Sequence, residues 1–201
     1  MFSIDIDPAF DVDLHADILE ITHLDLPWIP THIAASPPCE GFSPASIGSA
    51  WGGGHRAYEP KSETAILGVA LMAKTFGLIN DLLLRGCKTA IVENPRGVMR
   101  KVAPLPPAWT VTYCHFGDNT RMKPTDLWTF GMGDWWPGPP CHNQRPDHPA
   151  DCCCRDHESA PRGAKTGTQG IGNYADRSVI PEGLAREVLS ILTRTQPKEE
   201  G

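Results

Sequence analysis

The sequence lacks an uninterrupted apolar run of the roughly 18–20 residues that a membrane-spanning helix requires. Its first residues, MFSIDIDP, also lack the basic segment with which a secretory signal peptide begins. No internal repeat breaks the chain into equivalent units. These absences argue against a membrane or secreted protein and favour a soluble protein of the cytoplasm.

Basic residues are absent from the first 55 residues, which contain eight acids. The rest of the chain holds the other 16 of the 24 acids and all 18 Lys and Arg residues. A net charge of −6 argues against a simple basic nucleic-acid-binding protein. The asymmetry suits a protein that binds a small molecule at one end and a polyanion at the other, but on charge alone an ordinary solvated surface is the simpler interpretation.

The length and the cysteines indicate the size of the core and the state of the thiols. A chain of 201 residues with 40% apolar residues is long enough to bury one substantial core. Its seven cysteines are odd in number, and their spacing is not that of a small secreted scaffold. We therefore expect reduced thiols, as in a reducing cytosol.

The hydrophobic pattern predicts a parallel strand–helix–strand unit in the first half of the chain. Residues 2–6 alternate like a short strand, and residues 32–35 read as a buried strand. Residues 63–84 keep helical spacing after a capping Ser62, and residues 89–93 form the next strand. The Gly-, Ser- and Pro-rich stretch 41–61 between them is predicted to be a long mobile loop, a type that is often functional.

The second half is less regular. Two further strands are predicted at 111–116 and 127–130, joined by a polar turn. Residues 131–176 are rich in Pro, Gly, Cys and His and are predicted to be loop-like, whereas a helix with one apolar stripe follows Pro181.

Two short segments carry residues suited to chemistry. Pro37 and Pro38 stiffen the chain after the strand at 32–35, so that Cys39 projects at the carboxyl edge of a parallel sheet, where such sheets bind ligands. Glu93 ends the adjacent strand and should lie close to that thiol. The alternatives are a buried structural cysteine and a surface or helix-capping carboxylate.

Together these segments resemble the C5-cytosine-specific DNA methyltransferases, and in style the small phage-encoded members. Pro38-Cys39 matches the family's nucleophile motif, and Glu93-Asn94-Pro95 its Glu-Asn-Val motif with Pro in place of Val. Further motifs match in the family's order: Asp5-Ile6, Asp17-Ile18, Asn119-x-Arg121-x-Lys123 (for Gln-x-Arg-x-Arg), and Arg177 with Ile180-Pro181. The resemblance spans most of the chain.

The resemblance implies an α/β, Rossmann-like S-adenosylmethionine-dependent methyltransferase fold that lacks its first strand. It implies three catalytic residues: Cys39 as the nucleophile on cytosine C6, Glu93 at the pyrimidine N3 and exocyclic amine, and Arg121 at O2. The target base must be flipped out of the duplex, and the 41–61 loop would close over it. The residues implied in substrate and DNA contacts are Ser43, Asn94, Asn119 and Lys123.

S-adenosylmethionine is the cofactor that the resemblance implies. The residues at the cofactor-contacting positions are Asp5, Ile6, Asp17, Ile18 and Pro38. The family's glycine-rich Phe-x-Gly-x-Gly loop has no counterpart before Phe2. Three explanations remain open: Met1 is an internal residue of a longer chain, a second polypeptide supplies the loop, or the protein is a truncated relative that does not methylate.

The expected organisation is a catalytic core at 1–130, a small Cys/His-rich lobe resembling a target-recognition region at 131–176, and a C-terminal helix at 177–201 that packs back on the core. Within the lobe, Cys141, Cys152 and His157 could hold a zinc ion by tetrahedral Cys/His ligation. The alternative is a set of reduced thiols without metal.

The function implied is methyl transfer to C5 of a flipped-out cytosine in double-stranded DNA, in the cytoplasm of a bacterium or phage-infected cell. A second polypeptide that supplies the cofactor loop is a further expected partner. A non-catalytic DNA- or protein-binding relative is the alternative; transfer onto a free pyrimidine nucleotide ranks below both.

Overall fold

The computed structural model describes residues 1–43, 47–53, 57–116, 123–133, 135, 137–138 and 179–194, with side chains to residue 190. The chain divides into two compact units, the first comprising Met1–Pro106 with Thr129–Gly131. The second comprises Pro107–Trp128 with Met132–Gly201. Both units mix strands and helices, which confirms the α/β class.

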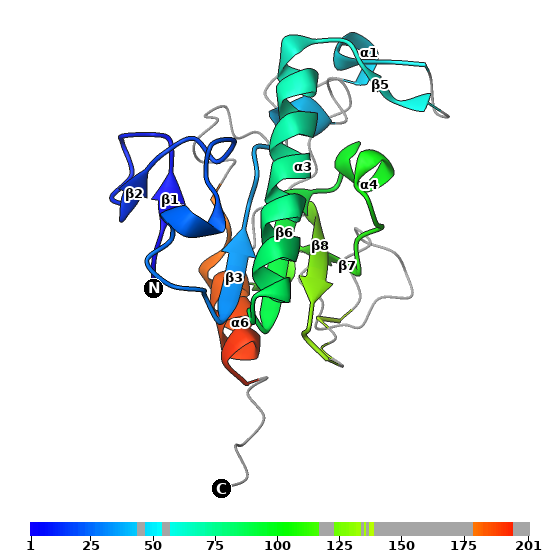
Figure 1. The fold of residues 1–201 in the computed structure, drawn as a ribbon. Coiled ribbons are helices and arrows are strands. Elements are labelled where there is room, and N and C mark those ends of the chain that lie inside the picture. The colour runs from blue at the N-terminus through cyan, green and yellow to red at the C-terminus, as the bar shows by residue number, and fades with distance from the viewer. Residues whose placement is uncertain are drawn as a thin grey trace, which may run out of the picture. The chain divides into compact units, whose positions relative to one another are not determined.

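The first unit is built on a parallel strand–helix–strand arrangement, as predicted. Strand β3 (His32–Ala35) pairs in parallel with β6 (Thr89–Pro95), and α3 (Glu63–Leu84) lies between them in the sequence. Figure 1 shows α3 lying across these two strands. A second parallel pair, β1 (Ile4–Asp5) with β2 (Leu14–His15), precedes them; β2 has no counterpart among the predicted elements.

The stretch 41–61 is more structured than the predicted mobile loop. After the 3-10 turn η2 (Glu40–Phe42), its described residues form α1 (Ile47–Ala50) and the antiparallel pair β4 (Trp51–Gly52) and β5 (Glu59–Pro60). Figure 1 places α1 and β5 near the amino end of α3. Glycines and serines alone suggested a loop, whereas Trp51 supplies the buried aromatic surface that holds these elements.

Local sequence explains the bounds of α3. The Ser62 side chain accepts a hydrogen bond from the Ala65 amide at 3.1 Å, and Gly86 follows the helix with φ of +109°. One stripe of the helix is buried, formed by Ala65, Met72, Phe76, Ile79 and Leu82. The opposite side exposes Ile66, Leu67 and Leu84, so the helix is apolar around much of its circumference.

Among the described residues, α3 is the one helix long and apolar enough to cross a membrane by length and composition, with a mean hydropathy of 1.6. A single such helix is weak evidence for a membrane span, because core helices of soluble proteins satisfy the same criterion.

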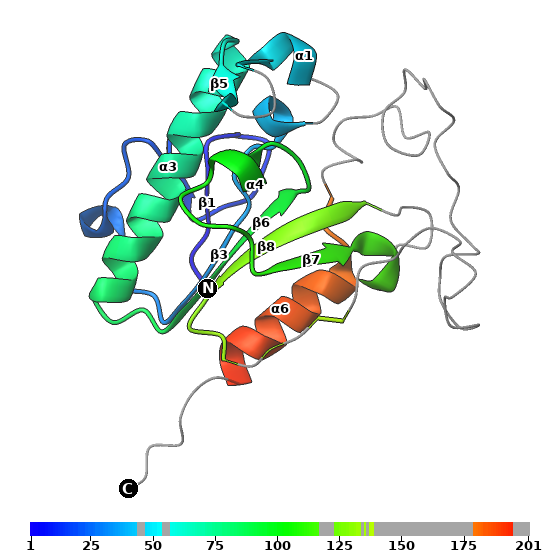
Figure 2. The ribbon, with the colours of Figure 1, turned by 90° about the vertical axis from the view of Figure 1, so that its right-hand side faces the viewer.

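The second unit contains an antiparallel strand pair and the C-terminal helix. Strand β7 (Trp109–Thr112) pairs with β8 (Pro124–Phe130), and the 3-10 turn η4 (Tyr113–Phe116) follows β7. The prediction of a strand over 111–116 is therefore wrong for its last four residues. The predicted C-terminal helix is present as α6 (Glu182–Arg194), and Figure 2 shows it beside β7.

Smaller elements complete the first unit. Thr22 caps the 3-10 turn η1 (His23–Asp25), and its side chain and backbone form a reciprocal capping box with Asp25. Helix α4 (Met99–Val102) follows β6, and its Met99 is fully buried. This short helix brings the chain back toward the residues that follow β3, because the Val98 amide donates to the Phe42 carbonyl at 2.8 Å.

The cap of α3 gives a first testable prediction. Ser62→Ala should lower the free energy of unfolding by about 1 kcal/mol, because the Ala65 amide loses its acceptor. Ser62→Asp retains an acceptor and should stay near the unaltered protein. Urea unfolding measures both; equal loss in the two variants would contradict the assigned cap.

Candidate functional site

The parallel register of β3 and β6 brings the two predicted catalytic segments together. Ala34 lies opposite Ile91 and Ala35 opposite Val92. Ser36 and Glu93 are the next residues on the two strands, so the Pro37–Cys39 segment and Glu93-Asn94 leave the same edge of the pair. This is the arrangement that the sequence predicted for the carboxyl edge of a parallel sheet.

Asn94 ties these segments to each other. Its side-chain amide donates to the Pro37 carbonyl at 2.8 Å, and the residue is fully buried. Its other polar atom, Oδ1, is buried and has no hydrogen-bond partner among the described residues. A buried amide with this bond fixes the chain just before Cys39 to β6.

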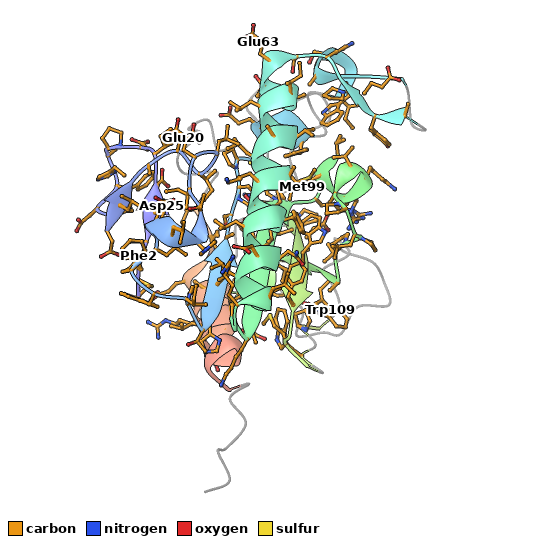
Figure 3. The ribbon with its side chains drawn as sticks, in the orientation of Figure 1. Phe2, Glu20, Asp25, Glu63, Met99 and Trp109 are labelled. Carbon is orange, nitrogen blue, oxygen red and sulfur yellow. The ribbon has the colours of Figure 1, made fainter. Side chains whose placement is uncertain are left out.

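The turn that carries Cys39 is held from three directions. Cys39 precedes η2, and its carbonyl accepts the Phe42 amide at 3.0 Å. The Gly41 carbonyl accepts the Trp51 indole N–H at 2.7 Å, and the Phe42 carbonyl accepts the Val98 amide at 2.8 Å. Figure 3 shows the side chains at this end of the unit, with Glu63 marking the amino end of α3 and Met99 lying on α4.

Close packing explains the glycine in this turn. A Cβ on Gly41 would lie 2.6 Å from the Thr64 carbonyl oxygen in the first turn of α3. The Phe42 ring, 1% exposed, lies over Gly68, where a Cβ would meet it at 3.4 Å. The turn therefore sits directly on α3, and two glycines permit that approach.

The exposure of the thiols distinguishes Cys39 from two other cysteines. Cys39 is partly exposed, whereas Cys87 and Cys114 are buried. Burial raises the pKa of the Cys87 thiol, which keeps it protonated and unreactive. Of these three thiols, Cys39 is the one that a ligand at the sheet edge could reach. Glu93 on β6 is partly exposed as well, so a carboxylate and a thiol are both accessible there.

The carboxylates predicted to bind the cofactor follow the other strand pair. Asp5 ends β1, and Asp17 lies two residues beyond β2. Each uses Oδ1 to accept an amide two residues on: Asp7 at 2.8 Å for Asp5, and Leu19 at 2.9 Å for Asp17. These turns hold each carboxylate through its Oδ1 atom.

The apolar positions predicted at the cofactor site differ in exposure. Ile6 is 65% exposed, an unusual state for an isoleucine, and Ile18 is partly buried. Pro38 is exposed, and Ser43 is partly buried just after η2. The two carboxylates can accept hydrogen bonds from hydroxyl and amine groups, and Ile6 can contact an apolar ring. These side chains therefore fit the adenosine part of S-adenosylmethionine.

In the second unit, Lys123 precedes β8. Its ammonium lies 4.8 Å from the centroid of the buried Tyr113 ring, a cation–π contact. The Lys123 carbonyl also accepts the Tyr113 amide at 3.2 Å. Asn119 and Arg121, predicted from the same motif, lie outside the described residues.

The predicted zinc ligands Cys141, Cys152 and His157 likewise lie outside the described residues. Within the ranges that the structure describes, no group of three or more His, Cys, Asp or Glu side chains is placed to hold a metal ion. The sequence-based zinc assignment therefore stays a prediction.

Sequence reasoning did not identify Trp51 or Gly41 as parts of the site. Both lie in a stretch rich in Gly and Ser, and the partners of Trp51 come from a turn ten residues earlier. The one available signal was a lone tryptophan inside that stretch, since buried Trp side chains usually find a partner for their N–H.

The comparison with curated proteins gave a relative in Frog virus 3 (isolate Goorha), described as a probable DNA (cytosine-5)-methyltransferase. The two are 30% identical over 128 residues, which is 59% of this chain; the chain spans 56% of that relative's length. This similarity confirms the resemblance to C5-cytosine methyltransferases that the motifs predicted. No family model and no solved structure matches the chain.

The Asn94 bond is directly testable. Asn94→Asp replaces the donor to the Pro37 carbonyl with a buried carboxylate, and should lower the free energy of unfolding by about 2 kcal/mol at neutral pH. Asn80→Asp makes the same chemical change on the exposed side of α3 and should alter it by less than about 0.5 kcal/mol. Chemical denaturation compares the two; equal effects would show that the bond contributes nothing.

Proposed function

We propose that this chain is the catalytic part of a DNA cytosine-5 methyltransferase, which transfers a methyl group to C5 of a cytosine flipped out of double-stranded DNA. The observation that carries the proposal is the β3–β6 register, with the Asn94 side chain bonded to Pro37, which brings the Cys39 and Glu93 segments to one edge. The similarity to the viral relative supports the same reaction.

Cys39 has the role of nucleophile in this proposal. Its thiolate attacks cytosine C6, a C6–S bond forms, and the ring electrons move to C5, which then becomes nucleophilic. The fixed turn at 39–42 suits this role because it presents the sulfur from rigid backbone rather than from a long side chain.

Glu93 stabilises that attack. Its carboxyl group, hydrogen-bonded to the pyrimidine N3 and exocyclic amine, offsets the negative charge that the ring acquires when sulfur adds. We assign Arg121 to the O2 side of the ring. Ser43, Asn119 and Lys123 are assigned to DNA, whereas Asn94 acts on the base through the backbone that it holds.

The Asp5 and Asp17 carboxylates hold the adenosine part of S-adenosylmethionine, with Ile6 and Ile18 against the adenine. When bound, S-adenosylmethionine supplies the methyl group that C5 takes. A base then removes the C5 proton, the electrons of that C–H bond re-form the ring double bond, and the Cys39 thiolate leaves.

We propose a Rossmann-like sheet in which a further strand pairs with β3. Within the part of the chain that the structure describes, β3 has a strand neighbour on one edge only, which is β6, and Ala34 in β3 is exposed. An unpaired strand edge offers a row of backbone donors and acceptors. A strand that precedes Met1 in a longer chain, or a strand from a second polypeptide, would satisfy them, and its glycine-rich loop would complete the cofactor site.

The covalent step predicts a trapped complex. Duplex DNA with 5-fluorocytosine at the target blocks loss of the C5 substituent, so an active site with Cys39 should accumulate a complex that survives denaturing electrophoresis in the presence of S-adenosylmethionine. Cys39→Ser should lose it entirely. Cys87→Ser should keep it, because Cys87 is buried and its hydrogen bonds to Thr31 and Thr89 can be made by a hydroxyl.

A complex that survives Cys39→Ser would refute the assigned nucleophile. Specific DNA binding without any complex, in unaltered protein that binds S-adenosylmethionine, would refute the methyltransferase and favour the non-catalytic DNA-binding relative.

Cofactor binding is measured by calorimetry on the chain, first without duplex DNA and then with it. Asp17→Asn should weaken S-adenosylmethionine binding about tenfold, because the amide keeps the turn to Leu19 but cannot offer a charged oxygen to the adenine amine. Asp7→Asn is the matched control: Asp7 accepts the Ala9 amide in the same kind of turn and is not assigned to the cofactor. Equal loss in both variants would contradict cofactor binding by these residues, whereas no binding to the chain alone would mean that the further strand and its glycine-rich loop are required.

A further inference from the structure

Trp51 lies at the junction between the cysteine-bearing turn and the 47–61 segment. It is 5% exposed, and its indole N–H donates to the Gly41 carbonyl at 2.7 Å. Its ring stacks on Phe42, with centroids 6.0 Å apart and planes inclined by 29°. The contacted residues are the second and third after Cys39.

The backbone on both sides of Trp51 is also held. Trp51 follows α1 directly and pairs with Pro60 in β5. The Lys61 amide donates to the Ala50 carbonyl at 2.9 Å, immediately before the capping Ser62 of α3. Trp51 is thus fixed to the amino end of α3 by main-chain bonds, and its side chain extends from there to the turn.

We propose that Trp51 is a positioning residue that couples α1 and the β4–β5 pair to the Cys39 turn, through the bond from its indole N–H to the Gly41 carbonyl. This inference rests on the proposed function, in which Cys39 attacks the flipped base. A displacement of these elements moves Trp51, and the Gly41 carbonyl then moves with it or loses its donor. The thiol is therefore held in its attacking position only while Trp51 keeps this bond.

The hydrogen bond, rather than the bulk of the ring, carries the coupling. Gly41 is buried, and a Cβ at this residue would meet the Thr64 carbonyl oxygen at 2.6 Å, so the residue has little room to move. A buried carbonyl in such a place cannot turn outward to find water when its donor is removed. Loss of the indole N–H therefore forces the turn itself to open.

Two substitutions separate the bond from the packing. Trp51→Phe keeps an aromatic ring against Phe42 but has no N–H. Trp51→His keeps a ring N–H, because Nε2 of a histidine occupies the position of the indole nitrogen in the five-membered ring, but loses the second ring. If Trp51 merely fills space, phenylalanine should replace it better than histidine; if it positions the turn, histidine should replace it better.

The first readout needs no enzymatic activity. Hydrogen exchange of the Phe42 and Val98 amides, both bonded within the turn or to it, should be about tenfold faster in Trp51→Phe than in the unaltered protein. Trp51→His should fall closer to the unaltered rate. The rate at which iodoacetamide alkylates Cys39 is measured by mass spectrometry, with buried Cys87 as internal reference. It should depart from the unaltered rate more in Trp51→Phe than in Trp51→His.

The second readout is the trapped complex with 5-fluorocytosine DNA. Trp51→Phe should slow its formation about tenfold with DNA affinity changed by less than about twofold, because the bond acts on the thiol and not on the duplex. Trp28→Phe is the control, since Trp28 is 54% exposed and its ring contacts Phe2. It should change neither readout.

The outcomes are separable. If unaltered protein that binds S-adenosylmethionine and DNA traps no DNA, the proposed function fails, while exchange and alkylation still decide the role of Trp51 in the turn. If Trp51→Phe matches the unaltered protein in exchange, alkylation and trapping, or outperforms Trp51→His in them, the coupling is refuted. Faster exchange with unchanged trapping would also refute it, because the turn would then open without consequence for the thiol.

Discussion

The parallel register of β3 and β6, closed by the Asn94 amide on the Pro37 carbonyl, is the constraint on which the rest of the site depends. The backbone hydrogen bonds between paired strands hold them along their length, but they leave the chain beyond each strand free to diverge. Asn94 removes that freedom at the point where β3 ends. The accessible thiol and the accessible carboxylate come from segments 54 positions apart in the sequence, and these segments are held together by this buried side chain, by the Val98–Phe42 bond and by the strands.

Much of the first unit followed from the sequence because its signals are local. Ser62 and the helical spacing after it gave the bounds of α3, and apolar strands flanked by Pro gave β3 and β6 with their parallel order. The prediction that 32–35 is a buried strand is wrong, because no residue of β3 is fully buried and Ala34 is exposed. The predictions failed where distant contacts decide the structure. Buried Trp51 stabilises a helical turn and a strand pair in a stretch that is rich in Gly and Ser. Residues 113–116 form a 3-10 turn although their composition favours a strand. The bond from Asn94 to Pro37 was not foreseen, because a motif names residues but not the direction in which a side chain hydrogen-bonds, and the contact of Asn94 with substrate stays a prediction.

The proposed reaction makes unequal demands on the parts of the molecule. In the proposed reaction Cys39 and Glu93 must be placed to within a fraction of an ångström, and they lie at the end of a strand pair covered by a helix of 22 residues. The carboxylates assigned to the cofactor tolerate more movement. Asp5 ends a two-residue strand, Asp17 lies two residues beyond another, and each forms an Asx turn. The cation–π contact with Tyr113 holds the Lys123 ammonium in place, and a positioned ammonium suits a phosphate better than a base edge.

The close contact of Gly41 with Thr64 has a consequence for how the site comes into being during folding. The turn from Cys39 to Phe42 has few bonds of its own, and its surroundings come from α3, from Trp51 and from Val98. Such a turn has little independent stability, because most of its contacts are made to the first turn of α3, to Trp51 and to Val98. In an unfolded chain, where those contacts are absent, Cys39 is an ordinary thiol in a flexible peptide. The position of the thiol therefore depends on the amino end of α3, and a change that frays this end alters the surroundings of Cys39.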